Sequence, residues 1–389
     1  MKKKYDLVVV GGGVLGTFHA YAAMDLGLKV ALIEKNNAPQ GATVRNFGQV
    51  VPSGMDSKWQ AYGRESLRIY KEIQSKFDIS VRQQGSVYLA SNEEEVQLLE
   101  ELAAINKQND YSSQLLTKSQ CLDKYDGLRS DYVKGGLFFP EEVIVEPRVM
   151  INKLHAYMKG EGLDLFFNKK ITQCEPLADE VLLITAMGET FKAAKVMICN
   201  GSDFETLYPK TFQESDLVVS KLQMMSTKPQ QNYRLQGSVL TGLSIRRYEA
   251  FEECASYKAI KAKESPDSLE KKWGVHILFK QACDGSVILG DSHEYASAKE
   301  KDLLGFDLNM DIDNFIIEES KKIMDLPNYD IQHRWFGMYS QCKTTDIYQK
   351  NMDDNIHIVT GIGGKGMTGS AGFSKENITK LYNKEECTL

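Results

Sequence analysis

Cysteines are few in this chain, and none lie close together in the sequence. The seven cysteines stand at positions 121, 174, 199, 254, 283, 342 and 387, and no two form a Cys-x-x-Cys pair. An odd, scattered set argues against a disulfide framework. We therefore expect reduced thiols in a cytoplasmic protein.

Long apolar runs and an excess of positive charge are missing as well. No window reaches the ~18 apolar residues that a membrane-spanning helix needs, and the net charge is −6. The apolar run from Leu7 to Val10 stops at three glycines, too early for the core of a secretory signal peptide. We expect no transmembrane segment, and no nucleic acid as a partner, because such proteins neutralise phosphates with positive charge.

The composition is otherwise that of an ordinary folded protein. The 389 residues are 42% hydrophobic and 26% charged, with 30 glycines and 9 prolines. A chain of this length holds roughly two to three domains of ~150 residues, and we begin from two.

The N-terminal segment carries the most informative pattern. Tyr5 to Val10 is typical of a buried strand and leads into the sequence GGGVLG at positions 11–16. A helix-compatible stretch, Thr17 to Leu26, and a second strand-like run, Lys29 to Glu34, follow. Together they predict a βαβ unit.

This unit predicts a dinucleotide site. Gly11 permits the tight turn, Gly13 lets the backbone approach a pyrophosphate, and Gly16 lets helix and strand pack closely. Glu34 ends the second strand and can accept hydrogen bonds from a ribose diol. Because Glu34 would repel a 2′-phosphate, and Lys35 extends past the strand end, we expect FAD or NAD.

Other segments predict further helices and strands. Helical spacing covers Leu67 to Phe77 and Glu93 to Asn106, and strands are predicted at Leu163 to Ile171, Val181 to Thr190, Lys195 to Gly201 and Asn355 to Thr360. From Ser215 to about Gln332 the pattern is that of antiparallel strands, for example at Leu243 to Tyr248 and Trp273 to Lys280. This middle region predicts a separate sheet domain inserted into the nucleotide-binding one.

A second glycine-rich segment, GIGGKGMTGS at positions 361–370, can open a helix from about Ala371 and offer its N-terminus to an anion. With GGGVLG, Glu34 and the antiparallel middle region, it makes the chain resemble the D-amino-acid oxidase, glycine oxidase and sarcosine oxidase family of flavoproteins over essentially its whole length. In that family the C-terminal loop passes beside the isoalloxazine ring. The resemblance therefore implies FAD rather than NAD.

Four more segments are similar to parts of that family. Gly41 to Gln49 looks like the segment that wraps the flavin diphosphate and ring, and Val145 to Arg148 looks like a helix start. Met197 to Gly201 looks like a strand end near the flavin, and Trp335 to Tyr339 looks like a Trp-x-Gly-x-Arg stretch.

The resemblance implies an α/β fold, α+β overall. It has a Rossmann-like FAD-binding domain over residues 1–80, 140–214 and 333–389, and an inserted, mostly antiparallel substrate-binding domain over residues 81–139 and 215–332.

The expected cofactor site combines both glycine-rich segments. We predict non-covalent FAD, because Gly337 stands where some sarcosine oxidases carry the cysteine that binds the flavin. The residues expected to contact FAD are Gly11, Gly13, Val14, Leu15, Gly16, Glu34, Lys35, Thr43, Arg45, Asn46, Gly48, Gln49, Ile171, Gly201, Gly337, Gly363, Gly364, Lys365, Gly366, Met367 and Thr368.

Three candidates for the chemistry lie in these flavin segments. Lys365, with the backbone N–H groups around it, is expected to stabilise negative charge on the reduced ring, unless its side chain points to solvent. Arg45 either contacts flavin or substrate or only neutralises phosphate. Tyr339 replaces the arginine that clamps the substrate carboxylate in many family members, which makes a simple α-amino acid less secure as the substrate.

Three further candidates lie in the middle region. Arg246 and Tyr248 share one face of a predicted strand, with Arg247 on the other, and a slip of one residue exchanges the faces. If that face lines the cavity, it binds an anionic substrate group; otherwise Arg246 is a surface arginine. His276 is predicted either to contact substrate or to be a core histidine.

The other histidines are not expected to act. Ser292 and His293 are neighbours in an extended chain and point to opposite sides, so a role in a turn is favoured over a nucleophile–base pair. His19 and His333 have no metal-ligand spacing, and no metal site is predicted.

The sequence thus predicts an FAD-dependent enzyme that oxidises a small primary or secondary amine with an anionic group. The imine product is then hydrolysed, and oxygen or a membrane quinone takes the electrons. One alternative is oxidation of a 2-hydroxy acid or a polyol phosphate, which needs a base for the hydroxyl. Another is a flavin-binding protein without turnover.

The segments at 45–54, 288–295, 334–340 and 363–368 also look like a branch of the family associated with aminophosphonate breakdown.

Overall fold

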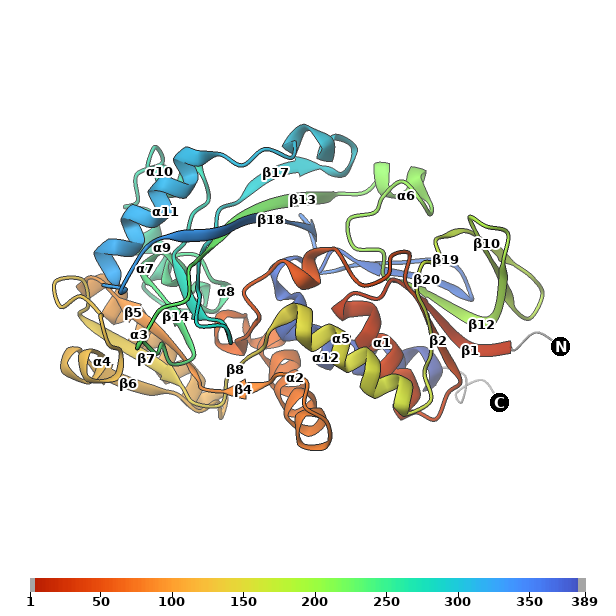
Figure 1. Ribbon diagram of the computed structural model, residues 1–389, viewed down its shortest axis with the longest axis horizontal. Coiled ribbons are helices and arrows are strands. Elements are labelled where there is room, and N and C mark those ends of the chain that lie inside the picture. Colours follow the sequence, from red (N-terminus) through yellow and green to blue (C-terminus); the bar gives the residue numbers. More distant parts are fainter. Residues whose placement is uncertain (1–3, 384–389) are drawn as a thin grey trace.

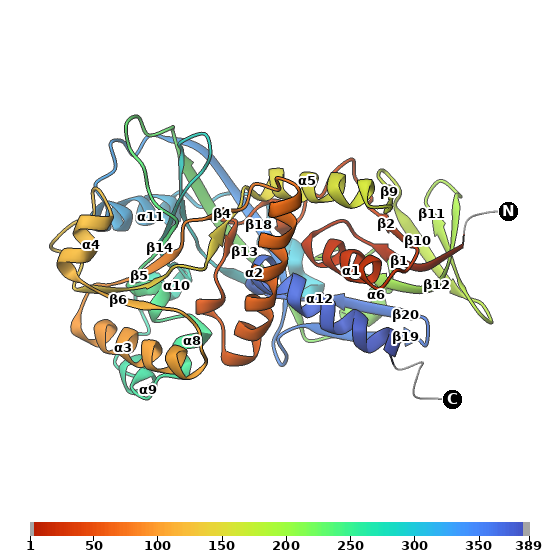
Figure 2. The ribbon, with the colours of Figure 1, turned by 90° about the horizontal axis from the view of Figure 1, so that it is seen from below.

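The computed structural model describes residues 4–383 and has two parts, each organised around a large sheet. In Figure 1 the eight-stranded sheet lies on the side that carries both termini, and the nine-stranded sheet forms the opposite end. The view in Figure 2 shows α2 (Ser57–Lys76) between the two parts, with α12 (Gly366–Asn383) running from beside it along the part that carries the termini. The chain is therefore an α/β fold with an added antiparallel part, as predicted.

The eight-stranded sheet is built on the predicted βαβ unit. β1 (Lys4–Val10) pairs in parallel with β2 (Val30–Ile33) and β12 (Thr190–Ile198), and α1 (Val14–Asp25) joins β1 to β2. β20 (Ile356–Thr360) lies parallel to β12. The glycine-rich turn after β1 and the glycine-rich loop after β20 therefore lie at the same edge of the sheet. The remaining strands of this sheet are β9 (Asp164–Phe166), β10 (Ile171–Pro176), β11 (Val181–Thr185) and β19 (Tyr348–Asp353).

Two predicted strands of this sheet are each divided in two. The stretch 163–171 is split between β9 and β10 by a turn at Asn168, whose φ is 56°. The stretch 181–190 is split between β11 and β12 by a turn at Gly188, whose φ is 78°. Left-handed backbone at a single residue reverses the chain without any change in hydrophobic pattern.

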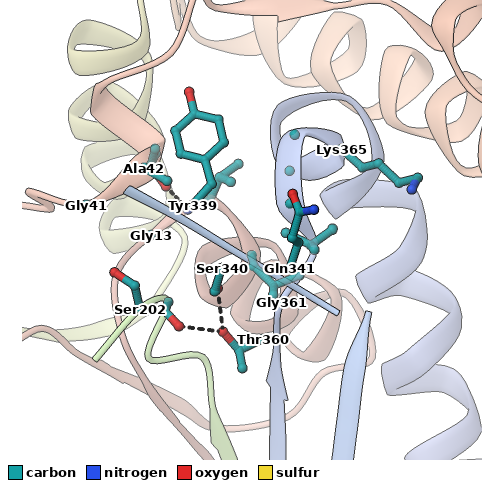
Figure 3. A pocket seen from close by; sticks show the side chains of 18 of the residues that line it. Gly13, Gly41, Ala42, Ser202, Tyr339, Ser340, Gln341, Thr360, Gly361 and Lys365 are labelled. Atoms are coloured by element: carbon teal, nitrogen blue, oxygen red, sulfur yellow. Dashed lines mark hydrogen bonds between the residues drawn. The ribbon is translucent and has the colours of Figure 1, made fainter. Parts of the chain in front are cut away.

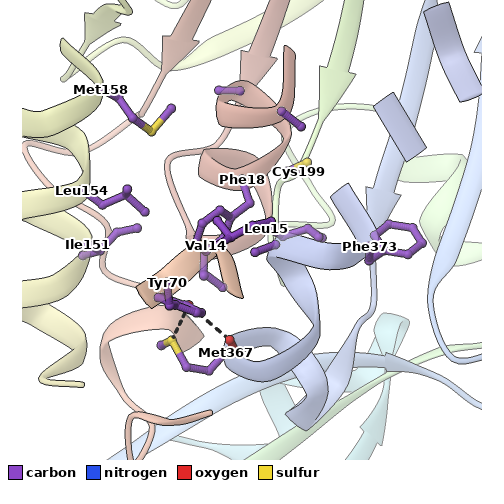
Figure 4. Close-up of a cluster of buried hydrophobic side chains, with 14 of the residues drawn as sticks. Val14, Leu15, Phe18, Tyr70, Ile151, Leu154, Met158, Cys199, Met367 and Phe373 are labelled. Carbon is purple, nitrogen blue, oxygen red and sulfur yellow. Dashed lines mark hydrogen bonds between the residues drawn. The ribbon is translucent and has the colours of Figure 1, made fainter. Parts of the chain in front are cut away.

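Helices α1, α2, α5 (Pro147–Gly160) and α12 form the core beside this sheet. Figure 4 shows α1 between α5 and α12, with Phe18, Leu154 and Met367 among the side chains that fill the space. The Tyr70 hydroxyl of α2 donates to the Met367 carbonyl at 3.2 Å, which ties α2 to the start of α12. The packing of α12 on α1 brings the N-termini of both helices to one edge of the sheet.

The nine-stranded sheet is mostly antiparallel. Its longest pair is β13 (Leu217–Thr227) with β18 (Ile331–Cys342), which runs from this sheet toward the C-terminal loop. The other strands are β5 (Ser86–Ala90), β6 (Gln114–Thr117), β7 (Gly135–Phe139), β14 (Ser238–Leu240), β15 (Leu278–Gln281), β16 (Val287–Gly290) and β17 (Glu294–Ser297).

Smaller elements complete the chain. A three-stranded sheet contains β3 (Gln49–Val50), β4 (Arg82–Gln83) and β8 (Val143–Ile144). The other helices are α3 (Glu93–Gln108), α4 (Lys118–Lys124), α6 (Pro209–Gln213), α7 (Gly242–Ile245), α8 (Glu249–Glu252), α9 (Tyr257–Lys261), α10 (Leu269–Lys272) and α11 (Met310–Ile323). Short 3₁₀ turns are η1 (Ala42–Val44), η2 (Pro52–Gly54), η3 (Ala298–Leu304) and η4 (Gly363–Lys365).

In the middle region one strand prediction is wrong and a second is confirmed only at its end. The stretch 243–248 forms α7 and the turn after it, where the Tyr248 N–H donates to the Ser244 carbonyl at 2.9 Å. In the stretch 273–280 only the end belongs to β15, because Gly274 has a φ of 57° and turns the chain. Residues 243–248 and 273–277 therefore connect strands instead of forming them.

The predicted helices are found. The two stretches at 67–77 and 93–106 lie in α2 and α3, and the C-terminal helix begins at Gly366, earlier than expected. Cysteines 121, 174, 199, 254, 283 and 342 are unpaired, whereas Cys387 lies outside the described residues. Within residues 4–383, no helix is both long and apolar enough to cross a bilayer.

The contact of α12 with α2 leads to a prediction about Gly372. A Cβ at Gly372 would lie 2.2 Å from the Tyr62 carbonyl oxygen, whereas one at Gly160 in α5 would meet nothing within 4 Å. We expect Gly372→Ala to destabilise the protein by about 1–3 kcal/mol. Gly160→Ala should be neutral or stabilising by about 0.5–1 kcal/mol. Urea unfolding would measure the free energy of unfolding of both variants. Equal changes in the two variants would contradict the close contact of α12 with α2.

Candidate functional site

A cavity of about 880 Å³ lies where the two parts meet. Its walls come from the β1–α1 turn, the segment 39–51, the end of β12, the C-terminal loop and, from the other sheet, β15 and β18. The volume is in the range of cofactor and ligand sites. Its place outside the carboxyl ends of parallel strands is where α/β sheets bind nucleotides.

The first glycine-rich turn is packed as its sequence predicted. Gly11 has a φ of 109°, and a Cβ there would lie 2.2 Å from the Cys199 carbonyl oxygen. A Cβ at Gly16 would lie 2.1 Å from the Gly11 carbonyl oxygen. Only glycine allows this approach, which places the N-terminus of α1 on the cavity wall.

Glu34 has the position expected for a ribose-binding carboxylate. It lines the cavity, is 6% exposed, and accepts hydrogen bonds from the Gly12 N–H at 2.9 Å and the Asn36 N–H at 3.0 Å. These two donors fix the orientation of the carboxylate. A carboxylate has further lone pairs, so it can also accept from a ribose diol.

Two threonine hydroxyls, those of Thr43 and Thr17, form hydrogen bonds with the backbone of the glycine turn. The Thr43 hydroxyl accepts from the Val14 N–H at 2.9 Å, and the Thr17 hydroxyl donates to the Gly12 carbonyl at 3.1 Å. His155 of α5 lies 2.9 Å from the Thr17 hydroxyl, and burial lowers the pKa of His155 to about 4. The neutral His155 was not among the residues predicted from the sequence, where only its place on the buried face of α5 could have indicated it.

The C-terminal loop closes the opposite wall. Residues 363–368 all line the cavity at the N-terminus of α12, and a Cβ at Gly364 would meet no atom within 4 Å. The Thr360 hydroxyl donates to the Gly201 carbonyl at 2.8 Å and lies 3.4 Å from the Ser340 hydroxyl (Figure 3). These bonds join the ends of β12, β18 and β20 around the cavity.

Lys365 reaches the cavity wall with its charge already paired. Its ammonium lies 2.6 Å from a Glu249 carboxylate oxygen and 3.3 Å from an Asp346 oxygen. Figure 3 shows its side chain pointing away from Gly13 and Tyr339. The favourable charge at this end of the cavity therefore comes from the α12 N-terminus and its backbone N–H groups.

The cavity brings together most of the predicted residues. Those on its walls are Gly11, Gly13, Val14, Leu15, Gly16, Glu34, Lys35, Thr43, Asn46, Gly48, Gln49, Ile171, Gly201, Tyr248, His276, Tyr339, Gly363, Gly364, Lys365, Gly366, Met367 and Thr368. Arg45, Arg246 and Gly337 do not line it.

Arg45 and Gly337 instead join η1 to β18. The Arg45 guanidinium donates to the Gln40 carbonyl at 2.9 Å and to the Phe336 carbonyl at 3.3 Å. The Arg45 carbonyl accepts from the Tyr339 hydroxyl at 3.4 Å. A Cβ at Gly337 would lie 2.5 Å from the Tyr339 ring. These contacts hold Tyr339 in place on the wall.

The structure exchanges the roles expected of two neighbouring arginines. Arg246 lies 2.8 Å from Glu95 and also pairs with Glu94 and Glu264, away from the cavity. Arg247 lines the cavity and donates to the Gly274 carbonyl at 2.7 Å and the Tyr295 hydroxyl at 3.1 Å. The helical turn of α7, in place of the expected strand, causes the exchange.

Three residues beside Arg247 form a polar cluster, consisting of His276, Asp291 and His293. His276 Nε2 lies 2.5 Å from an Asp291 carboxylate oxygen, and His276 Nδ1 lies 3.3 Å from the Ser244 hydroxyl. Burial opposes ionisation of Asp291, but His276, His293 and Arg247 together lower the pKa of its carboxyl. Asp291 is therefore an ionised carboxylate on the cavity wall at neutral pH.

His293 also lines the cavity, although its sequence context predicted only a turn there. Its Nδ1 lies 2.9 Å from the Gly274 carbonyl. Because a carbonyl only accepts, Nδ1 must donate, which leaves the lone pair of the neutral ring on Nε2. Burial lowers the pKa of His293 to about 3, so the ring is neutral.

Two groups of side chains within residues 4–383 bring potential metal-ligand atoms within 4.8 Å of one another. One is the polar cluster, where His276 already contacts Asp291. The other is Asp56 with Glu249 and Asp346, where Lys365 already contacts two of the three carboxylates. In both groups, side chains that could hold a metal ion thus already contact a neighbouring side chain.

Comparisons with known proteins agree with this architecture. The family model for DAO, described as FAD dependent oxidoreductase, matches residues 6–377. Glycine oxidase from Geobacillus kaustophilus has a similar structure, with a TM-score of 0.76, 16% identity, and coverage of 98% of this chain and 95% of that one. The FAD-bound L-α-glycerophosphate oxidase from Mycoplasma pneumoniae has a TM-score of 0.74 and 18% identity, with 98% and 95% coverage.

Among curated relatives, the chain is 28% identical to glycerol 3-phosphate oxidase of Mycoplasma genitalium over 97% of this chain and 95% of that one. It is 26% identical to glycine oxidase of Bacillus licheniformis over 52% of this chain and 55% of that protein. For several other relatives, too, the match spans less than two thirds of their length.

The position of Glu34 leads to a prediction about cofactor affinity. Glu34→Gln removes a charge and one acceptor, so we expect the dissociation constant for FAD to rise about tenfold, for a loss of about 1–2 kcal/mol. Titration of apoprotein with FAD, followed by quenching of flavin fluorescence, would measure it. Glu175→Gln, an exposed residue of β10 outside the cavity, is the charge-matched control. Equal affinities of both variants would contradict the assignment.

Proposed function

The chain belongs to the DAO family of FAD-dependent oxidoreductases, and we propose that it oxidises a small amine that carries an anionic group. FAD is the cofactor of this family, and when bound it accepts the hydride that leaves the substrate carbon. The observation that supports an anionic substrate is Arg247, a guanidinium on the cavity wall.

The cavity fits FAD in shape and in charge. Turns at Gly11 and Gly13 leave room beside the N-terminus of α1 for a diphosphate, and Glu34 suits a ribose. The open backbone at Gly364 and the N-terminus of α12 would stabilise negative charge on the ring end of the cofactor. The expectation of non-covalent FAD stays part of this proposal.

Arg247 is suited to bind the substrate anion. Two of its N–H groups are used by the Gly274 carbonyl and the Tyr295 hydroxyl, both neutral acceptors that orient it without cancelling its charge. No ion pair among residues 4–383 involves Arg247. A guanidinium in this state binds a carboxylate or a phosphonate through its remaining donors.

Two tyrosines add aromatic hydroxyls to the cavity wall. Tyr248 and Tyr339 both line the cavity. Burial raises the pKa of each above the ordinary tyrosine value, so both hydroxyls are neutral. The Tyr339 hydroxyl already donates to the Arg45 carbonyl, which leaves Tyr248 as the donor of the pair. The oxidised product, an imine, would be released to water for hydrolysis, with oxygen or a quinone as the electron acceptor of this proposal.

A second candidate function is oxidation of a hydroxyl beside a phosphate or carboxylate. It is favoured by the relative matched over 97% of this chain, whose name is glycerol 3-phosphate oxidase. His293 Nε2 has a lone pair that can accept a hydrogen bond from the substrate hydroxyl, while burial keeps the pKa of this ring low. A flavin protein without turnover has no such support, because the family is one of oxidoreductases.

A panel of substrates separates the two reactions. Anaerobic bleaching of the flavin absorption band would be measured with glycine, sarcosine, D-amino acids, aminoethylphosphonates, 2-hydroxy acids and glycerol 3-phosphate. Bleaching by amines supports the proposed function. Bleaching by hydroxyl compounds alone rejects it in favour of the second candidate.

The arginine pair gives a matched test of the anion site. We expect Arg247→Met to raise the KM of the anionic substrate about 100-fold, which is about 2.7 kcal/mol, while FAD stays bound. Arg246→Met should lower the melting temperature, because Glu95 loses its partner, but should leave KM nearly unchanged. If KM rises more for Arg246→Met than for Arg247→Met, Arg246 and not Arg247 binds the substrate anion.

A further inference from the structure

The polar cluster beside Arg247 places a negative charge next to a positive one. Asp291 and Arg247 both line the cavity, and their charges interact, yet no ion pair within 4 Å joins them in the described part of the chain. Two opposite charges that face one cavity without meeting are complementary to a ligand that carries both signs. A zwitterion would satisfy both at once.

Asp291 is held as an acceptor. His276 Nε2 contacts one of its oxygens at 2.5 Å and, since a carboxylate only accepts, carries the proton. The Ser244 hydroxyl can then donate to His276 Nδ1 at 3.3 Å, which fixes the imidazole ring. The His276 backbone N–H also donates to the Asp291 carbonyl at 3.0 Å, so the two residues are joined twice.

His293 adds a second acceptor at the same place. Its Nδ1 donates to the Gly274 carbonyl, so Nε2 is the nitrogen with the lone pair. The rings of His276 and His293 have centroids 5.5 Å apart, and a nitrogen of each lies within 4.8 Å of the Asp291 carboxylate. An ammonium group has three N–H donors, whereas a hydroxyl has one.

On these grounds, and resting on the proposed function, we propose that Asp291 binds the ammonium group of the substrate, with His293 as a second acceptor and His276 as the residue that positions Asp291. The substrate is thereby a zwitterion whose anionic end contacts Arg247. The cluster selects amines over hydroxyl compounds with the same anion.

The test measures binding rather than turnover. Each pair of ligands shares an anion and differs only at nitrogen or oxygen: glycine with glycolate, and 2-aminoethylphosphonate with 2-hydroxyethylphosphonate. Dissociation constants for the FAD-loaded protein would be taken from ligand-induced changes in the flavin spectrum under anaerobic conditions. For any ligand that bleaches the flavin, the dithionite-reduced protein would be titrated by calorimetry.

We expect the wild-type protein to bind the amine of one pair at least tenfold more tightly than the hydroxyl compound. Asp291→Asn should weaken the amine about 50-fold and the hydroxyl compound less than threefold. Equal weakening of both members, or no preference in the wild type, would overturn the proposal. FAD content and reduction by dithionite would show that the variant is folded and loaded.

His276→Gln keeps the carboxylate but removes the imidazole that contacts it at 2.5 Å, and its effect should appear in the pH profile. Amine binding is lost below the pKa of Asp291, and that pKa rises without His276. The loss should therefore move to higher pH. The other groups that face Asp291, namely His293, Arg247, Tyr248 and Tyr339, are unchanged in this variant. A uniform loss of affinity without a shifted profile would reject the positioning role.

Failure of the proposed function is distinguishable from failure of this inference. A wild-type protein that prefers amines in binding, but whose flavin only hydroxyl compounds bleach, would reject amine oxidation and leave the ammonium site standing. If amines bleach the flavin, but the dissociation constants for amines are the same in the wild type and in Asp291→Asn, amine oxidation stands and the ammonium site is rejected.

Discussion

The backbone contact among β1, α1 and β12 decides where every other part of the site lies. The turn at Gly11 rests directly on the Cys199 carbonyl, and α1 starts so close to that turn that Gly16 leaves no room for a side chain. This contact fixes the N-terminus of α1 at the edge where β12 and β20 also end. Since α12 packs along α1, its own N-terminus is brought to the same edge. Two helix N-termini therefore face one cavity.

Charged side chains are paired differently in two regions of the cavity: near the two helix N-termini, where the cofactor would bind, and near Arg247, where the substrate is proposed to bind. Lys35 pairs with Asp203, and Lys365 pairs with Glu249 and Asp346, so two lysines on the wall have their charges compensated. Backbone N–H groups and helix dipoles, which need no counter-ion, then face an anionic cofactor together with Lys170 and Lys343, which also line the cavity. At the substrate end Arg247 is oriented by neutral groups only.

Local patterns could be predicted from the sequence, whereas contacts across the inserted part could not. The βαβ unit, Glu34 and the C-terminal loop each lie within a few residues of a strand end, so spacing alone places them at the nucleotide edge. Arg246 and Arg247 show the opposite case. Their roles depend on whether residues 243–248 are a strand or a helical turn, and the hydrophobic pattern of six residues does not decide this. Likewise, His276 meets Asp291 only because Leu278 pairs with Gly290 in the β15–β16 hairpin, and that register was not readable from the sequence.

The difference between backbone and side-chain contacts explains why the family alone does not determine the substrate. The flavin-binding half uses backbone geometry, which many sequences can reproduce, so chains with 16–18% identity keep the fold. The wall proposed to bind substrate uses side chains on connections between strands: Arg247 follows α7, Asp291 follows β16 and His293 precedes β17. Connections between strands vary more in sequence and length among related proteins than the strands that they join. In the proposed function, specificity thus rests on a short hairpin and one helical turn, carried on a scaffold that tolerates their variation.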